Sequence, residues 1–425
     1  MNNVYLFLYN FIWTVIIILS LPLIQILKNR RFAERLDPIF PHPPPRKGSI
    51  WIHALSVGEV VSSIPLVKTL KQKYPTKDIV FSVTTPQGIK IAKHDLGGLV
   101  EILLPMPFDF WWSVKKIVKY IKPSIFILVE TDIWPGLILL LKNRGFKTIL
   151  INGRISPRTF RSYKRFSFFV RRVFSGIELC IMQSHLDSSR LLDIGIPASK
   201  VITSGNIKFD RAWHPMDEKE YKHWTNILNM GREDIVWVAG SIHRGEDEII
   251  LECLKRLLPE FSELRLIIAP RRVEWTEDIL RLSRLKGLRA ARRTELHESR
   301  EPYDVLILDT VGELGRIYGL GTITFVGGSL LPIGGHNLLE PASFGRPVLF
   351  GLHTHNFVLM ARLLIEAGGG KRVTDTEDLI RTMRELLSDQ ERSGGMGKRA
   401  KKFVEMNRGA LGSIMEHIGS YIEPA

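Results

Sequence analysis

Cysteine is nearly absent from this chain of 425 residues, which contains only Cys180 and Cys253. Both stand in apolar runs at a spacing that matches no zinc or redox motif. A disulfide framework and a cysteine-ligated zinc site are therefore excluded, and the composition is typical of a reducing cytoplasm. Hydrophobic residues make up 45% and charged residues 24%, the balance of a globular protein. At roughly 150 residues per domain, this length predicts two or three domains.

Acidic residues are also in deficit. The sequence has 59 lysines and arginines against 44 aspartates and glutamates, which gives a formal net charge of +15. Such an excess favours an anionic partner or a membrane surface. Nucleic acid, anionic lipid and phosphorylated substrates all remain open on composition alone.

Long apolar runs are lacking except at the N-terminus, where Val4 to Leu27 contains no charge. A helix over this run would reach about 36 Å, enough for a bilayer core of about 30 Å. The run lacks the preceding charge and the following cleavage site of a signal peptide. Lys28, Arg30 and Arg31 follow it, so the positive-inside rule predicts a single span with the N-terminus outside and everything after Lys28 in the cytoplasm. A buried core helix and an interfacial anchor are the alternatives.

The rest of the chain reads as an α/β protein. After the anchor (1–30) and a proline-rich linker (31–49), short apolar runs alternate with amphipathic stretches, which is the pattern of βαβ units in a parallel sheet. The expected strands are Ile50 to Ala54, Ile79 to Val83, Val100 to Leu104, Ile125 to Val129, Thr148 to Ile151, Ile235 to Ala239, Leu264 to Ala269, Val305 to Leu308, Ile323 to Val326 and Pro347 to Phe350. A polar stretch around Asp210 to Glu233 interrupts the pattern. We therefore expect two doubly wound, Rossmann-like domains, 50–215 and 230–425, facing one another across a cleft.

Two loops of the first domain carry carboxylates directly after expected strands. Glu59 suits a general base at a cleft mouth, although Ser56 as N-cap with Glu59 as its capping-box partner is the local alternative. Glu130 and Asp132 can orient a substrate or hold a neighbouring cation, and Thr131 or Asp132 is equally plausible as an ordinary N-cap. A third loop, later in the domain, places Lys208 where it either neutralises a phosphate or is simply solvated.

The second domain contains the strongest ligand-binding pattern. Glycines at 327–328 and 334–335 let backbone N–H groups approach a phosphate, and a helix expected to begin near Asn337 adds its positive dipole. Glu340, one turn later, can accept hydrogen bonds from a ribose diol. Pro270-Arg271 and Val311-Gly312-Glu313 also follow expected strands. No Walker A or GxGxxG fingerprint is present, so nucleotide binding is indicated but the nucleotide is not specified.

Ile151 to Gly176 is a basic segment without acidic residues, in which aromatic residues stand between the cations. Its cations are Arg154, Arg158, Arg161, Lys164, Arg165, Arg171 and Arg172. This pattern suits single-stranded nucleic acid, an anionic membrane or a phosphorylated lipid, and the apolar N-terminal run favours lipid. A solvated amphipathic helix whose aromatic side chains face the core is the simpler alternative.

Metal binding has little support in the sequence. His353-Thr354-His355 has a ligand-like spacing, but no HExxH, suitable acidic pair or cysteine cluster accompanies it. We therefore expect structural roles for these histidines, and neither a metal nor a cofactor.

A series of motifs resembles one known family. The motifs HALSVGE, ETDIWP, NGRIS, GNIKFD, AGSIHRGEDE, APRR, FVGGS, GGHNLLEPASFG and GLHTHNF occur in the order found in the 3-deoxy-D-manno-octulosonic acid (Kdo) transferases. The resemblance runs from the N-terminal anchor to about Phe357 and beyond. It implies a GT-B fold and inverting, metal-independent transfer of Kdo from CMP-Kdo to lipid IVA, the lipid A precursor, in lipopolysaccharide core biosynthesis.

The resemblance also implies roles for individual residues. Glu59 would be the general base, and Glu130 and Lys208 would stabilise the transition state. The CMP contacts would be Pro270, Arg271, Val311, Gly312, Glu313, Asn337, Leu338, Leu339 and Glu340. The basic segment would form the acceptor and membrane surface, and nucleic acid would not be a partner. Arg272-Val273 departs from the His-Pro that usually follows the proline-arginine pair in the family.

Overall fold

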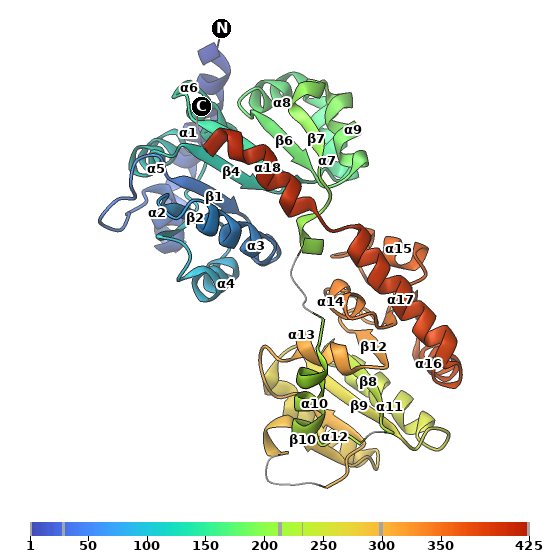
Figure 1. The fold of residues 1–425 in the computed structure, drawn as a ribbon. Helices are drawn as coiled ribbons and strands as arrows, with labels where there is room; N and C mark the ends of the chain where they lie inside the picture. The colour runs from blue at the N-terminus through green and yellow to red at the C-terminus, as the bar shows by residue number, and fades with distance from the viewer. Residues whose placement is uncertain (1, 28–29, 211–214, 232, 297–300, 423–425) are drawn as a thin grey trace. The chain divides into compact units, whose positions relative to one another are not determined.

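The computed structural model describes residues 2–27, 30–210, 215–231, 233–296 and 301–422, with the backbone alone at 2–6, 20–27, 30 and 31. The chain forms two compact units (Figure 1). Unit 1 consists of Met1–Ala212 and Asn407–Ala425, and unit 2 of Trp213–Met406.

Unit 1 is built on a parallel sheet with strand order β3-β2-β1-β4-β5-β6-β7. The strands are β1 Ile50–Ala54, β2 Ile79–Val83, β3 Ile102–Pro105, β4 Ile125–Val129, β5 Lys147–Gly153, β6 Leu179–Met182 and β7 Val201–Thr203. The helices are α1 Asn2–Leu27, α2 Arg30–Leu36, α3 Val57–Lys73, α4 Pro86–Leu96, α5 Trp111–Ile121, α6 Pro135–Asn143, α7 Pro157–Arg165, α8 Ser167–Phe174, α9 His185–Ile194, η1 Ala198–Lys200, η2 Ile207–Asp210 and α18 Ala410–Ile422.

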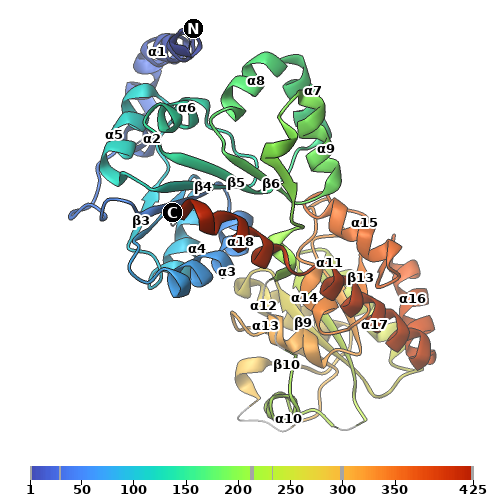
Figure 2. The ribbon, with the colours of Figure 1, turned by 45° about the horizontal axis from the view of Figure 1, so that its top comes forward.

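Both faces of this sheet are buried, which explains the continuous apolar runs of its strands. Alternate residues of β1 point to opposite faces. Ile50 and Ile52 pack in a core with α3, α4 and α18, whereas Trp51 packs in a second core with α5, α6, α8 and α9. Figure 2 shows α3 and α18 beside the first face and α5 and α6 beside the second.

Unit 2 repeats this architecture with strand order β10-β11-β9-β8-β12-β13-β14, again entirely parallel. Its strands are β8 Ile235–Ile242, β9 Leu264–Pro270, β10 Ala290–Arg292, β11 Val305–Ile307, β12 Ile323–Val326, β13 Val348–Phe350 and β14 Gly370–Arg372. Its helices are α10 Glu218–Ile227, α11 Glu246–Leu257, η3 Val273–Trp275, α12 Thr276–Leu285, η4 Arg293–Glu295, α13 Leu314–Ile317, η5 Tyr318–Leu320, α14 Leu339–Ser343, α15 Val358–Glu366, α16 Thr376–Ser388 and α17 Gln390–Met406.

Each sheet has one point at which the chain reverses its direction across the sheet. In unit 1 the chain runs from β1 toward β3 on one side and from β4 toward β7 on the other. In unit 2 the adjacent strands β8 and β12 are the corresponding pair. Loops diverge at the carboxyl ends of such strands and leave a crevice in which doubly wound proteins bind ligands. Ligand-binding residues are therefore expected after β1 and β4 in unit 1, and after β8 and β12 in unit 2.

The expected pair of parallel α/β domains is confirmed, but the assignment of all residues from 230 to 425 to the second domain is wrong. Helix α18 belongs to unit 1, where Ile414 and Ile418 are fully buried in the core of the first sheet face. Asp210 accepts hydrogen bonds from the N–H groups of Gly409 and Leu411, both at 2.6 Å, and so holds the start of this helix. Strands β6, β7, β10 and β14 were also not expected, although β11 and β13, which are equally short, were.

Helix α1 packs on unit 1 through one side. The hydroxyl of Tyr9 donates a 2.6 Å hydrogen bond to Asp109, a buried carboxylate that also accepts from the N–H groups of Gly136 and Leu137 at the start of α6. Among the described residues, no helix has the length and apolar character needed to cross a membrane. Lys28, part of the expected positive-inside signal, lies outside the described residues.

Candidate active site

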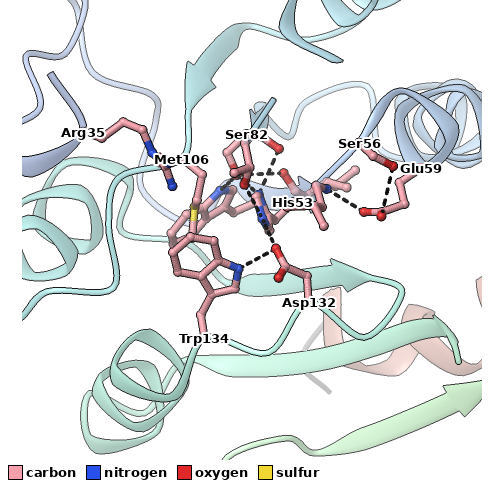
Figure 3. A network of polar contacts seen from close by, with 12 residues as sticks. Arg35, His53, Ser56, Glu59, Ser82, Met106, Asp132 and Trp134 are labelled. Carbon is pink, nitrogen blue, oxygen red and sulfur yellow. Dashed lines mark hydrogen bonds and ion pairs between the residues drawn. The ribbon is translucent and has the colours of Figure 1, made fainter. Parts of the chain in front are cut away.

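Glu59 lies in the first turn of α3, at the reversal point of unit 1 (Figure 3). Its carboxylate accepts hydrogen bonds from the N–H of Leu55 at 2.5 Å and from the hydroxyl of Ser56 at 3.2 Å. Ser56 is the N-cap residue but makes no side-chain cap bond, so the capping box, the alternative interpretation of Glu59, does not form. Burial, followed by the charge of Glu130, raises the pKa of Glu59 to about 7. A carboxylate with this pKa can accept a proton near neutral pH.

Glu130 and Lys208, 78 positions apart in sequence, form an ion pair. Lys208 Nζ lies 2.8 Å from Glu130 Oε1, and Asn152 Nδ2 lies 3.4 Å from the same oxygen. Lys208 is therefore not merely solvated. Glu130 has a φ of 58° and Asn152 a φ of 50°, a left-handed conformation that is uncommon for residues other than glycine. Such backbone strain is often found at functional sites.

Asp132 contacts a buried histidine and does not cap a helix. Its Oδ2 accepts from the indole N–H of Trp134 at 2.8 Å and lies 3.4 Å from Nε2 of His53. The other imidazole nitrogen of His53 is bonded to Ser82 at 3.0 Å, and Figure 3 shows His53, Asp132 and Trp134 pointing toward one another. The N-cap of α6 is Trp134, so the alternative that Thr131 or Asp132 caps this helix is wrong.

The loops after β1 and β4, the end of β5 and the η2 helix after β7 thus gather a base, a carboxylate–ammonium pair and an amide in one region of unit 1. Glu130 is close enough to Glu59 to raise its pKa, while Lys208 keeps Glu130 paired. This arrangement can remove a proton from a bound hydroxyl and supply positive charge nearby.

The basic segment folds as the end of β5 followed by α7 and α8. Six of its cations are exposed (Arg154, Arg158, Arg161, Lys164, Arg165 and Arg171), and Arg172 is half-buried. None of the seven forms an ion pair with a carboxylate of the described residues. The alternative in which the aromatic side chains all face the core is wrong, because Phe166 and Phe168 are 62% and 58% exposed. The result is a surface whose cations have no carboxylate partner among the described residues, with Lys164 and Arg165 lying over the rings of Phe160 and Phe166.

The residues expected to bind a nucleotide follow β9, β11 and β12 of unit 2. Pro270 ends β9, and the N–H of Arg271 donates to the backbone oxygen of Ile242 at the end of β8. Val311 is 89% exposed, and Gly312, which follows it, has open space where a side chain would begin. These groups lie at the carboxyl edge of one sheet, where ligands of this fold bind.

Glu313 and Glu340 have partners inside unit 2. Glu313 accepts from Thr310 at 2.7 Å and pairs with Arg293 at 3.3 Å. Asn337 Nδ2 lies 3.3 Å from Glu340 Oε1. The helix expected near Asn337 begins two residues later, at Leu339 with Leu338 as N-cap, because the side chain of Asn337 accepts the N–H of Leu339. Glu340 is therefore in the first turn of α14.

Three residues at these edges were not singled out from the sequence. The side chain of Asn152 contacts Glu130 and also accepts a hydrogen bond from the N–H of Ile207. In the sequence, only its place before a glycine at a strand end pointed to the unusual backbone conformation of Asn152. His53 and Glu246 are fully buried polar residues whose partners come from distant segments. As for metals, the described residues contain no group of three His, Cys, Asp or Glu side chains suited to hold an ion.

Residues 30–211 match the family model of 3-deoxy-D-manno-octulosonic-acid transferase (kdotransferase). The 3-deoxy-D-manno-octulosonic acid transferase of Haemophilus influenzae is 32% identical, with 98% of this chain and 99% of the relative covered. The enzyme of the same name from Aquifex aeolicus is 31% identical over 88% of this chain and 94% of its own. Among solved structures, UDP-GlcNAc 2-epimerase from Neisseria meningitidis, bound to UDP-GlcNAc, covers 88% of this chain and 100% of its own at a TM-score of 0.59 and 15% identity, a likeness of fold alone.

Proposed function

Because this chain belongs to the 3-deoxy-D-manno-octulosonic acid transferase family, we propose that it transfers Kdo from CMP-Kdo to lipid IVA, the lipid A precursor, in lipopolysaccharide core biosynthesis. The family identified from the sequence motifs is confirmed by full-length relatives, and with it the assignment as a glycosyltransferase. The donor, the acceptor, the stereochemistry and the roles of individual residues are the proposal.

The buried carboxylate of Glu59, with its raised pKa, is the main support for the proposed chemistry. In one inverting displacement, its carboxylate takes the proton from an acceptor hydroxyl, the hydroxyl oxygen attacks the anomeric carbon of Kdo, and the bond to the CMP phosphate breaks with its electron pair on phosphate. A pKa of about 7 leaves a large fraction of Glu59 ionised at neutral pH while keeping it basic enough to take the proton.

The remaining groups supply charge and orientation. Lys208, held by Glu130, stabilises negative charge in the transition state of the proposed reaction. The nucleotide is bound by the loops of unit 2 that carry Arg271, Glu313 and Glu340. Neither a metal nor a cofactor takes part in this reaction.

We further propose a membrane location, in the bacterial inner membrane, with the two units in the cytoplasm. Three features support it: the uncharged run Val4 to Leu27, the apolar side chains that α1 exposes, such as Phe11 at 57% and Leu19 at 76%, and the basic segment. Exposed apolar rings next to cations that lack carboxylate partners suit an anionic lipid surface, and the proposed acceptor is itself an anionic lipid.

The direct test is an assay of Kdo transfer by the purified full-length protein. The protein is supplied with CMP-Kdo and a bis-phosphorylated lipid IVA acceptor in a buffer that contains EDTA. Mass spectrometry should detect acceptor that has gained Kdo, together with released CMP. Acceptor that stays unmodified while the donor is intact would contradict the proposal. Product formed only after a divalent cation is restored would contradict the metal-independent mechanism.

A further inference from the structure

Two histidines face each other at the reversal point of unit 2. His243 directly follows β8, and His336 lies in the loop after β12, the neighbouring strand. Their Nε2 atoms are 2.9 Å apart, and the two rings are nearly parallel, with an interplanar angle of 10°. A contact of this length requires one ring nitrogen to donate its proton to the other.

A buried carboxylate holds the two loops together. Glu246 is fully buried and accepts four backbone hydrogen bonds: from His243 at 3.0 Å, Gly328 at 2.7 Å, and Ser329 and Leu330 at 2.9 Å each. The first donor follows β8 and the other three follow β12. Glu246 therefore sets the separation of the two loops that carry the histidines.

The glycine turn packs directly against the rings. Gly328 has a φ of +67°, and a Cβ at this position would lie 3.0 Å from the ring of His336 and 3.5 Å from that of His243. Its carbonyl oxygen accepts the N–H groups of both Gly334 and Gly335. A residue with a side chain would displace the rings, so the turn and the histidine pair form one rigid arrangement.

Positive charge surrounds this arrangement. Arg271 starts beside the pair, because its N–H donates at 2.8 Å to Ile242, the residue before His243. Burial, then the guanidinium of Arg271, lowers the pKa of His336 to about 4. Burial also lowers the pKa of His243, an effect that Glu246 opposes and that Arg271 and Arg272 reinforce. Both imidazoles are therefore neutral at pH 7.

The proton count of the neutral pair leaves one nitrogen free. Two neutral imidazoles carry two protons on four nitrogens, and one of these protons lies between the Nε2 atoms of His243 and His336. The second proton is on Nδ1 of the accepting ring, so Nδ1 of the donating ring has a lone pair. A third proton on that Nδ1 would make both Nδ1 atoms donors and give the pair one positive charge.

We propose that the His243–His336 pair takes up one proton from solvent when the phosphate of a nucleotide binds beside Arg271, and so acts as a charge-adapting part of the donor site. The inference rests on the proposed function, which places the nucleotide on unit 2. A bound phosphate offsets the charge of Arg271, and an anion favours the charged form of a neighbouring imidazole. The pair thereby presents a cation when the phosphate is present and is neutral when it has left.

Isothermal titration of the full-length protein with the methyl ester of CMP tests this proposal. This phosphodiester has a fixed charge, unlike CMP, whose phosphate titrates near pH 6. Titrations at pH 7 in two buffers of different ionisation enthalpy give the protons taken up per ligand. We expect between about 0.5 and 1 proton, and a Kd that tightens up to about tenfold per pH unit as the pH falls from 8 to 6.

Variants locate the proton. His336→Asn and His243→Asn should each bring the uptake close to zero, while His223→Asn, the same change on the exposed surface of α10, should leave it unchanged. Ligand binding by the wild-type protein without proton uptake would overturn the proposal, and so would full uptake in His336→Asn. If transfer from CMP-Kdo is intact in the same preparation, only the histidine proposal is overturned. If both transfer and ligand binding are absent, the proposed function is overturned with it.

Discussion

At the scale of single residues, Glu59 shows how a buried carboxylate is made basic. It lies in the first turn of α3 with one backbone donor and one hydroxyl donor, too few bonds to offset its burial. The nearby carboxylate of Glu130 adds a repulsion that further favours the protonated form. The same burial and repulsion that destabilise the ionised carboxylate also raise its pKa into the range that the proposed base requires.

Glu59→Gln should abolish most transfer while leaving nucleotide binding intact. An amide cannot accept the acceptor proton, so we expect turnover to fall by about 10²- to 10⁴-fold. The wild-type rate should rise with pH through a midpoint near 7, since the ionised carboxylate is the active form. Rates measured across pH 5.5–8.5, with Glu416→Gln on the exposed side of α18 as control, check both points. Wild-type turnover in Glu59→Gln would remove this residue from the catalytic role.

The same substitution should stabilise the protein at high pH. The pKa of Glu59 rises from 4.5 to about 7 on folding, so its contribution is favourable below pH 4.5 and is lost as the pH rises through 7. Glu59→Gln removes this loss, and the free energy of unfolding at pH 8 should exceed that of the wild type by up to about 3 kcal/mol. Urea unfolding at pH 8 and pH 4 measures it, and an equal difference at both pH values would contradict the assignment.

At the scale of elements, α7 and α8 present a basic surface to solvent, while Val170, Val173 and Phe174 of α8 pack in the core. Their exposed cations lack carboxylate partners among the described residues, and Phe166 and Phe168 stand beside them. Charge of this kind attracts anionic lipid over about a Debye length, and the rings add apolar contact.

Removing charge from α7 should weaken binding to anionic vesicles. Each cation near such a surface contributes about 1 kcal/mol, so Arg158→Gln with Arg161→Gln should lower the affinity roughly 30-fold. Lys398→Gln with Lys402→Gln makes the same change in net charge on α17 and should have little effect. Sedimentation with phosphatidylglycerol vesicles gives the two affinities. Equal losses in the two double variants would show that only net charge matters.

At the scale of the whole molecule, the cations behind the net charge of +15 lie in separate places and have different partners. Arg271 and Arg272 help to lower the pKa of His243 in unit 2, and Lys208 forms an ion pair with Glu130 in unit 1. The cations of the basic segment form no ion pair with a carboxylate of the described residues. The two units use the same plan, with functional groups after the adjacent strands at which each sheet reverses. Composition could not distinguish these groups of cations, because it does not say where each residue lies in the fold.

Local pattern was sufficient for the main elements of the fold. Strands such as β1 and β4 lie where the apolar runs predicted, because both faces of a strand in a parallel sheet are buried. The motifs were likewise sufficient for the family, which full-length relatives confirm. Glycines and charges after strands also pointed to the loops that carry Glu59, Lys208 and Arg271.

Only the tertiary structure decided which of these loops meet. Strand order brings Glu130 to Lys208 across 78 positions and His243 to His336 across 93, and sheet order is set by packing between distant segments, which no local pattern encodes. The placement of α18 in unit 1 was likewise decided by packing between distant segments. The apolar face of an amphipathic helix can cover either sheet, and its sequence alone does not say which one. The pKa of Glu59 depends on burial and on Glu130 together, so it belongs to the folded arrangement and to no single residue.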